Sequence, residues 1–306
     1  PQVARERYEA YRTANEVRRK KLEADTWTAA FFWPITEETD WAPTYAEFLR
    51  LRDEGPEAIP ATALEQIEAL AERYKFFHWH VEFPDVFGDD GGFDVMLGNP
   101  PWERIKLQEK EFFADKAPEI AEARTAAQRR KLIKKLPQAD PDLHAAYVAA
   151  LRESETTSHF LRESGRYPLS AVGDVNTYQV FAGLVRQIVG PRGRVGIVVP
   201  SGIATDYYNQ DYFSTVVEEG ELVSFYDFEN RAKLFPEVDS RMKFALLTLT
   251  GGEVDEAEFA FFLHTTDDLA DPERRFGLSR EEVALMNPNT GTVPVFEKTP
   301  PLRVAS

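Results

Sequence analysis

The sequence predicts an α/β fold, in which strands and helices alternate along the chain. Three short apolar runs, at residues 93–97, 194–199 and 222–228, have the length and composition of buried strands. An amphipathic helical pattern over 176–189 lies between the first two runs. A strand, a helix and a strand in this order predict a right-handed parallel crossover, with ligand-binding loops at the carboxyl ends of the strands.

The amino-terminal part of the chain is predicted to be helical. Residues 1–25 are charged and rich in alanine, which favours an exposed helix. The aromatic segment 27–34 is expected to lie in a core. An amphipathic helix is predicted over 61–76, and Thr62 and Glu65 have the spacing of a capping box at its start.

Four further segments complete the predicted elements. The aromatic segment 76–87 has the character of a strand, whereas 103–165 is mostly polar and helical and is interpreted as an insertion. Two more strands are predicted at 244–249 and 257–263. The glycine pair at 251–252 lies between them and predicts a hairpin turn.

Composition limits the kind of protein that the chain can be. It contains no cysteine, which excludes disulfides, thiolate zinc sites and a cysteine nucleophile. No run of about 18 apolar residues is present and no signal peptide opens the chain, so we expect a cytoplasmic protein without a membrane span. The net charge of −16 argues against nucleic-acid binding, but residues 124–135 carry basic side chains and no acidic one.

The segment Asn99-Pro100-Pro101-Trp102, directly after the apolar run, is the most informative for chemistry. Proline can neither continue a sheet nor enter a helix interior, so a stiff loop brings an amide and an aromatic ring to the carboxyl edge of the sheet. The Asn99 side-chain oxygen and the Pro100 carbonyl can accept both N–H bonds of a planar amine, while Trp102 stacks on its ring. A base in a duplex must first be flipped out to reach such a loop.

This motif resembles that of the DNA amino-methyltransferases, and its context resembles the Eco57I-type restriction–modification methylases. The resemblance covers roughly residues 76–115 and 175–296, in FHWHVEFPDVF, GGFDVMLGNPPWERIKLQEKEFF, NTYQVFAGLV, RVGIVVPSGI, KLFPEVDSRMKFALLTL and NPNTGTVPVF. It implies a Rossmann-like class I methyltransferase core, incomplete because this chain carries its carboxyl-side strands, with a helical insertion.

The resemblance also implies an activity, namely methyl transfer from S-adenosylmethionine to adenine N6 in double-stranded DNA, within a restriction–modification or phage-defence system. Asparagine in the first motif position implies adenine. Residues 99–102 then form the catalytic loop, and Trp102 and Phe235 stack on the flipped adenine, although Phe235 also fits a core position. Asn99 would contact the cofactor. Subunits of the same restriction or defence system are expected partners.

The family pattern is not complete in this sequence. No glycine-rich cofactor loop follows a predicted strand, so we expect that loop upstream of Pro1 and the DNA-recognition region beyond Ser306. The segment by itself is then expected to bind the cofactor weakly or not at all, and can be inactive. The resemblance divides the chain into a helical region at 1–75, a catalytic core at 76–296 with the insertion at about 103–170, and a tail at 297–306.

The basic segment is a candidate for contacts with DNA phosphates, which give affinity without sequence information. The alternative is a solvated helix face. The side chains expected to contact phosphate are Arg129, Arg130, Lys131, Lys134 and Lys135.

Other chemically capable residues give weaker signals. The five histidines, among them His78 and His80, show no metal-ligand grouping, so no metal is expected. Ser201 does not lie in a nucleophile elbow and is expected to line the site or turn the strand. Asp94 is expected to support the catalytic loop, whereas Asp85 and Glu82 are weak cofactor-side candidates, and no nuclease constellation is present.

Two other functions stay open. A protein-glutamine methyltransferase would use the same loop, because the glutamine amide is also a planar, delocalised NH₂ group. A non-catalytic DNA-binding or interaction module with a methylase-like fold would explain the missing cofactor loop. The insertion and the basic segment favour DNA as the substrate.

Overall fold

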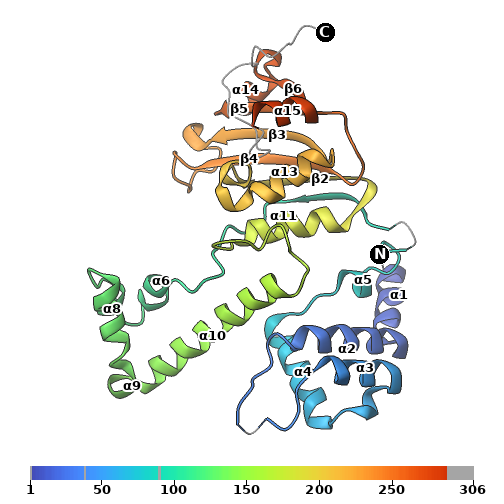
Figure 1. The fold of residues 1–306 in the computed structure, drawn as a ribbon, viewed down its shortest axis with the longest axis vertical. Coiled ribbons are helices and arrows are strands. Elements are labelled where there is room, and N and C mark those ends of the chain that lie inside the picture. Colours follow the sequence, from blue (N-terminus) through green and yellow to red (C-terminus); the bar gives the residue numbers. More distant parts are fainter. Residues whose placement is uncertain (1, 38, 89–90, 288–306) are drawn as a thin grey trace. The chain divides into compact units, whose positions relative to one another are not determined.

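The computed structural model describes residues 2–37, 39–88 and 91–287, and the chain divides into two compact units (Figure 1). The first unit contains residues 1–89 and 152–163, and the second contains 90–151 and 164–306. Most of the last resembling sequence block and the predicted tail at 297–306 lie outside the described residues. No helix in the described part of the chain is long and apolar enough to cross a bilayer.

The first unit is helical, as its sequence predicts. Its core contains Phe32, Leu51 and Ile67, which confirms that the aromatic segment 27–34 contributes to a core. Phe160 of the long helix α10 packs against the same core. The helices of this unit are α1 (Gln2–Thr13), α2 (Asn15–Ala29), α3 (Tyr45–Glu54), η1 (Pro56–Ala58), α4 (Ala61–Tyr74), α5 (Trp79–Glu82) and residues 152–163 of α10 (Pro141–Glu163).

Two local predictions for this unit are wrong. Helix α4 begins at Ala61 with Pro60 at the cap, so Thr62 lies inside the first turn and forms no capping box. The aromatic segment at 76–87 contains the helix α5 instead of a strand. Its conformation is fixed by tertiary contacts, because buried His78 bonds through Nε2 to the Asp25 carboxylate at 2.8 Å.

The second unit is built on one six-stranded sheet with the order β1-β2-β4-β3-β5-β6 (Figure 1). The pairs β1–β2 and β3–β5 are parallel, and the other neighbouring pairs are antiparallel. The strands are β1 (Phe93–Gly98), β2 (Val189–Pro200), β3 (Leu222–Glu229), β4 (Lys243–Thr250), β5 (Glu256–Leu263) and β6 (Phe276–Ser279).

The predicted α/β class is confirmed, together with the crossover between two parallel strands. Helix α11 (Thr177–Ile188) joins the parallel strands β1 and β2 and begins with a capping box between Asn176 and Gln179. Together with α13 (Gln210–Glu218) and α15 (Arg280–Met286), it supplies apolar side chains to the largest core. The short helices between and after the sheet strands β2 to β6 are α12 (Gly202–Thr205), η2 (Tyr207–Asn209), η3 (Asn230–Ala232), α14 (Thr266–Ala270) and η4 (Pro272–Arg274).

The sheet corrects two sequence predictions. The apolar run at β1 is not buried: Val95 is 63% exposed and Leu97 is 82% exposed, because β1 is an edge strand that pairs with β2 alone among the described strands. The glycine pair at 251–252 does not turn a hairpin, because β5 pairs with β3 rather than with β4. Gly251 instead allows a close backbone approach, since a Cβ there would overlap the carbonyl oxygen of Gly190.

The predicted insertion is helical but has a hydrophobic core of its own. Phe113, Ile120, Leu136 and Tyr147 are buried together in it. Its helices are α6 (Glu109–Phe113), α7 (Pro118–Ala121), α8 (Ala126–Ile133), α9 (Leu136–Ala139) and the first part of α10. The segment therefore packs as a small helical element and not as a solvated polar stretch.

Candidate functional site

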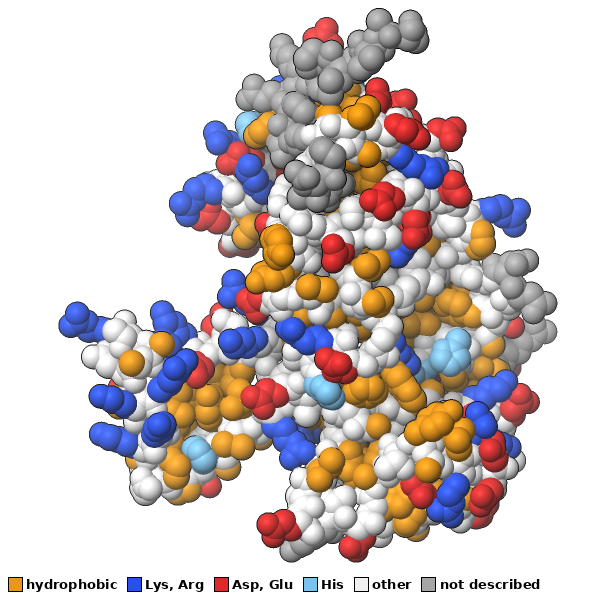
Figure 2. Space-filling view, in the orientation of Figure 1, with side chains coloured by type: hydrophobic (Ala, Val, Ile, Leu, Met, Phe, Trp, Pro, Cys, Tyr) orange, Lys and Arg blue, Asp and Glu red, His pale blue; other side chains and the backbone are white. Residues whose placement is uncertain are grey.

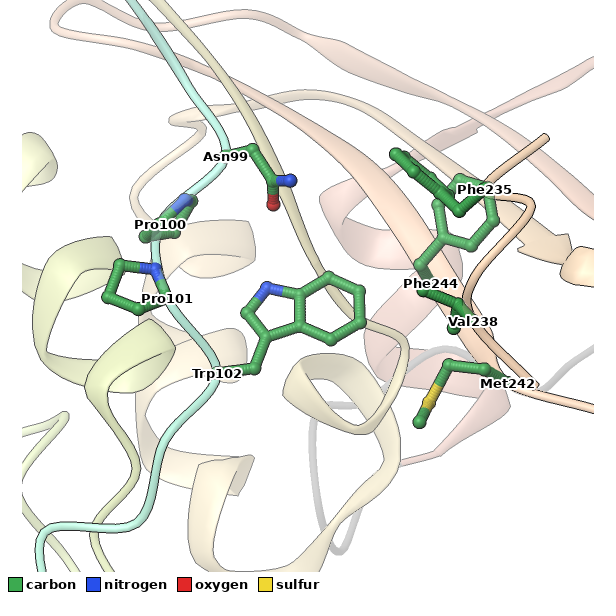
Figure 3. A pocket seen from close by; sticks show the side chains of 8 residues that line it. All are labelled: Asn99, Pro100, Pro101, Trp102, Phe235, Val238, Met242 and Phe244. Carbon is green, nitrogen blue, oxygen red and sulfur yellow. The ribbon is translucent and has the colours of Figure 1, made fainter.

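The loop of residues 99–102 leaves the carboxyl end of β1 and forms one wall of a cavity of about 240 Å³ (Figure 3). Asn99 is exposed, and its amide points from the loop toward the space beside the Trp102 indole. Pro100 and Pro101 have no backbone N–H and a fixed φ angle, so the loop reaches this position with few alternative conformations. The structure thus brings all four predicted catalytic residues to one cavity.

Trp102 is anchored at one edge while its ring lines the cavity. The indole is partly buried against the core, and its Nε1–H donates to the carbonyl oxygen of Val198 on β2 at 3.4 Å. This bond fixes the plane of the indole relative to the sheet. The ring is therefore only partly packed inward and keeps a surface at the cavity.

The wall opposite Trp102 is apolar and largely aromatic (Figure 3). Phe244 lies on β4, stacks on Phe228 and meets the ring of Phe235 nearly at a right angle, with centroids 5.1 Å apart. Sequence reasoning assigned Phe235 to the site, and the structure places it in this wall. The sequence analysis did not identify Val238, Met242 and Phe244, which line the same cavity.

A fully buried asparagine holds the segment that carries Phe235. The Asn230 amide nitrogen donates to the carbonyl oxygens of Phe235 and Val238, at 2.9 and 3.0 Å. Its side-chain oxygen accepts the Phe235 N–H at 3.0 Å. Asn230 directly follows β3, so the end of this strand fixes the aromatic wall. The sequence analysis did not identify Asn230, although its position just after a predicted strand could have marked it as a candidate.

Asp227 and Asp239 are among the acidic groups of this unit whose pKa values are shifted. The Ser201 hydroxyl donates to the buried Asp227 carboxylate, and burial raises the pKa of Asp227 despite this bond. Ser201 is thus a partner of Asp227 and does not line the described cavity. On the exposed segment after Phe235, hydrogen bonds from the side chain and backbone N–H of Arg241 lower the pKa of Asp239 to about 2.

The basic candidates separate into two environments. Arg130, Lys131, Lys134 and Lys135 are exposed on α8 and just after it, where Figure 2 shows basic side chains gathered. Arg129 differs from these four because it is only 8% exposed and lies 3.8 Å from the Glu109 carboxylate. It acts within the helical insertion, so it is not available to a phosphate in this conformation.

The remaining candidates are not among the residues that line the cavity. Asp94 is exposed on β1. Glu82 accepts a hydrogen bond from the Tyr8 hydroxyl at 2.8 Å, and Asp85 is exposed in the same helical unit. Within residues 2–37, 39–88 and 91–287, no group of three or more potential metal ligands comes together.

The second unit is thus an α/β domain whose candidate site combines an exposed amide with aromatic and apolar side chains. The sequence model of the Eco57I restriction-modification methylase family matches residues 35–133, about a third of the chain. This match includes the loop of residues 99–102 and confirms the resemblance to these methylases over that segment. No curated protein sequence matches the chain.

Three of the solved structures that match the chain come from restriction–modification systems. The type IIG restriction endonuclease BpuSI has 16% identity and a TM-score of 0.35, over 65% of this chain and 20% of that one. A type I methyltransferase subunit from Streptococcus thermophilus has 14% identity and a TM-score of 0.33, over 45% of this chain and 34% of that one. A modification subunit of a putative type I restriction enzyme from Vibrio vulnificus YJ016 has 13% identity and a TM-score of 0.33, over 82% of this chain and 68% of that one.

Likenesses at these TM-scores do not establish a common arrangement of the whole chain. The chain spans a fifth of the length of the first of these proteins and about a third of the second. The activity and partners of a complete protein therefore belong to the proposal that follows.

Proposed function

We propose that this chain forms the base-binding part of a DNA adenine-N6 methyltransferase, with S-adenosylmethionine as the methyl donor. The observation that carries the proposal is the loop of residues 99–102, which faces an aromatic wall across one cavity within a unit that the Eco57I-type family model partly covers. We place the activity in the cytoplasm, within a restriction–modification or phage-defence system whose other subunits are its partners.

The loop supplies acceptors that suit the adenine amine. The amine nitrogen is a weak nucleophile, because its lone pair is delocalised into the ring. Acceptance of its two N–H bonds by the Asn99 side-chain oxygen and the Pro100 carbonyl would favour the pyramidal nitrogen that attacks a methyl group. The prolines hold the two acceptors in place before the base arrives. The additional proton leaves after methylation, when the nitrogen has become acidic.

The opposite wall favours a base over a protein glutamine. A glutamine amide would satisfy the same two acceptors, but it carries no ring for the Trp102 and Phe235 side chains to enclose. A flipped adenine presents two flat faces, and stacking on an aromatic side chain contributes about 1–3 kcal/mol per base. The apolar lining by Val238 and Phe244 suits a ring and offers nothing to a flexible polar chain.

The described residues provide only part of what S-adenosylmethionine requires. Gly251 and Gly252 follow β4, but the backbone of Gly190 and Pro191 fills the space beside them, so this pair cannot cradle a ligand. The proposal therefore assigns the donor no contact in this chain beyond Asn99 at the cavity. This gap is the one observation that favours the alternative of a non-catalytic methylase-like module.

Contact with the DNA backbone is assigned to the exposed part of the basic segment. Four cations on and after α8 lie on one helical element, and each can neutralise a phosphate. These contacts would hold the duplex without reading its sequence. Arg129 is left out of this set because it is buried beside Glu109.

A transfer assay with the native protein distinguishes the three functions. Radiolabelled methyl groups from S-adenosylmethionine are offered to duplex DNA and, separately, to a glutamine-containing protein. Label in DNA alone is expected. Label in protein alone would support the glutamine alternative, and no label together with no calorimetric binding of S-adenosylmethionine would support the non-catalytic module.

A further inference from the structure

The loop of residues 99–102 is tied to the start of helix α11 by a single hydroxyl group. Thr177 Oγ1 donates to the carbonyl oxygen of Pro101 at 2.6 Å. Thr177 Oγ1 also accepts the backbone N–H of Glu103 at 3.0 Å. The hydroxyl therefore binds the chain on both sides of Trp102, once as a donor and once as an acceptor.

Backbone contacts reinforce this connection. The Thr177 N–H donates to the Glu103 carbonyl at 2.9 Å, and the Ile105 N–H donates to the Val175 carbonyl at 3.1 Å. Arg104 and Asn176 form an isolated antiparallel bridge between these contacts. The chain after the candidate catalytic loop thus runs beside the residues that open α11.

Thr177 is itself held in a rigid position. Asn176 and Gln179 form the capping box that begins α11. The Gln179 amide donates to the Asn209 side chain at 2.6 Å, and Asn209 donates to the Gly202 carbonyl just after β2 at 2.9 Å. Gln179 and Asn209 are both buried. A buried polar network therefore connects the first turn of α11, which carries Thr177, with Gly202 just after β2.

The bond to Pro101 has a specific consequence for the loop. Neither proline of the loop has an N–H, so hydrogen bonds can fix these two residues only through their carbonyl groups. With the Pro101 carbonyl turned toward Thr177, the peptide plane between Pro101 and Trp102 is set. The preceding carbonyl, that of Pro100, then keeps one orientation relative to the Asn99 amide.

We propose that Thr177 is a positioning residue that aims the Asn99 and Pro100 acceptors at the reacting amine. The inference rests on the proposed function, because it concerns the geometry of the same amine site. Thr177 touches no reacting atom, and its effect on the reaction passes through the Pro101 carbonyl and the Glu103 N–H. A loss of alignment of about 1 Å can reduce turnover by about a hundredfold.

The test compares Thr177→Val with Thr177→Ser in the native protein. Valine keeps the β-branched shape but has no hydroxyl, and serine keeps the hydroxyl without the methyl group. Hydrogen exchange, resolved to single amides, is measured for Glu103 and Ile105. Methyl transfer to duplex DNA is measured in parallel, with kcat and the KM for DNA determined separately.

The Glu103 amide is expected to exchange at least about tenfold faster in Thr177→Val and at the native rate in Thr177→Ser. Ile105, whose bond to Val175 needs no hydroxyl, serves as the internal control. The kcat for methyl transfer is expected to fall by about 10- to 100-fold in the valine variant at an unchanged KM, and to recover in the serine variant.

Two results would overturn the inference. Unchanged Glu103 exchange in Thr177→Val would show that the hydroxyl does not fix the loop, whether or not the protein methylates DNA. Faster exchange at an unchanged kcat would show that the fixed loop has no part in turnover. A native protein that transfers no methyl group to DNA would instead refute the proposed function, and the exchange comparison would still decide whether Thr177 braces the loop.

Discussion

Replacement of Asn230 by alanine would remove the side chain that holds the aromatic wall of the candidate site. Its amide makes three bonds of 3.0 Å or less, two as donor to the Phe235 and Val238 carbonyls and one as acceptor from the Phe235 N–H, besides a longer contact of 3.4 Å with the Asp239 carbonyl. Asn230 is fully buried, so water does not take over these bonds in the native conformation. At about 1 kcal/mol net for each bond, Asn230→Ala is expected to lower the free energy of unfolding by about 3 kcal/mol.

Urea unfolding followed by pulse proteolysis measures this change, provided that the slope m stays the same. Arg231→Ala is a matched control in the same short helix. The Arg231 side chain is 64% exposed and forms a salt bridge with Glu229, so its loss is expected to change stability by less than about 1 kcal/mol. A loss below about 1 kcal/mol for Asn230→Ala would refute the role given to this residue.

Three further predictions follow from the same structure. Compared with the native protein, Asp227→Asn is expected to gain more unfolding free energy at about pH 8 than at about pH 4. Burial raises the Asp227 pKa above 3.8, so ionisation of Asp227 removes stability from the native protein as the pH rises through the folded-state pKa. Urea unfolding at both pH values measures this effect, and a difference from the native protein that does not depend on pH would contradict it. Combined replacement of Lys131 and Lys134 by glutamine is expected to reduce the slope of log K for DNA binding against log salt by about 2. Arg129→Ala, in contrast, should leave that slope unchanged and destabilise the insertion. Trp102→Leu is expected to weaken capture of a flipped base by about 1–3 kcal/mol and Trp102→Phe by less, as read from 2-aminopurine fluorescence at the target position; equal binding by the two variants would argue against stacking.

The parts of the site that could be predicted from sequence are those with local signals. The loop of residues 99–102 follows a short apolar run, and two prolines end the strand whatever the rest of the chain does. The start of α11 was also accessible, because Asn176 and Gln179 form a capping box within four residues. These short-range rules correctly placed the loop of residues 99–102 at the end of a strand and the crossover helix before the next one.

The far wall of the cavity could not be predicted in the same way. Phe244 reaches the site because β4 inserts between β2 and β3, and this pairing depends on residues distant in sequence. The same reason explains the error at the glycine pair 251–252, where sequence proximity suggested a hairpin. The burial of β1 was overestimated because an apolar run looks alike in a central strand and in an edge strand.

The basic segment shows a further limit. Its six positive charges are evident from sequence, but the pattern does not tell which of them turns inward. Arg129 is buried because Glu109 and the small core around Phe113 lie beside α8. Only the three-dimensional arrangement separates this structural arginine from the five exposed cations.

The central claim is that the Asn99 amide holds the adenine amine during methyl transfer. Its most direct test is mass spectrometry of nucleosides from duplex DNA treated with the native protein and with Asn99→Ala, with circular dichroism to confirm that the variant folds. N6-methyladenine is expected with the native protein and at least about a hundredfold less with the variant. Equal amounts of N6-methyladenine from both proteins would contradict the claim.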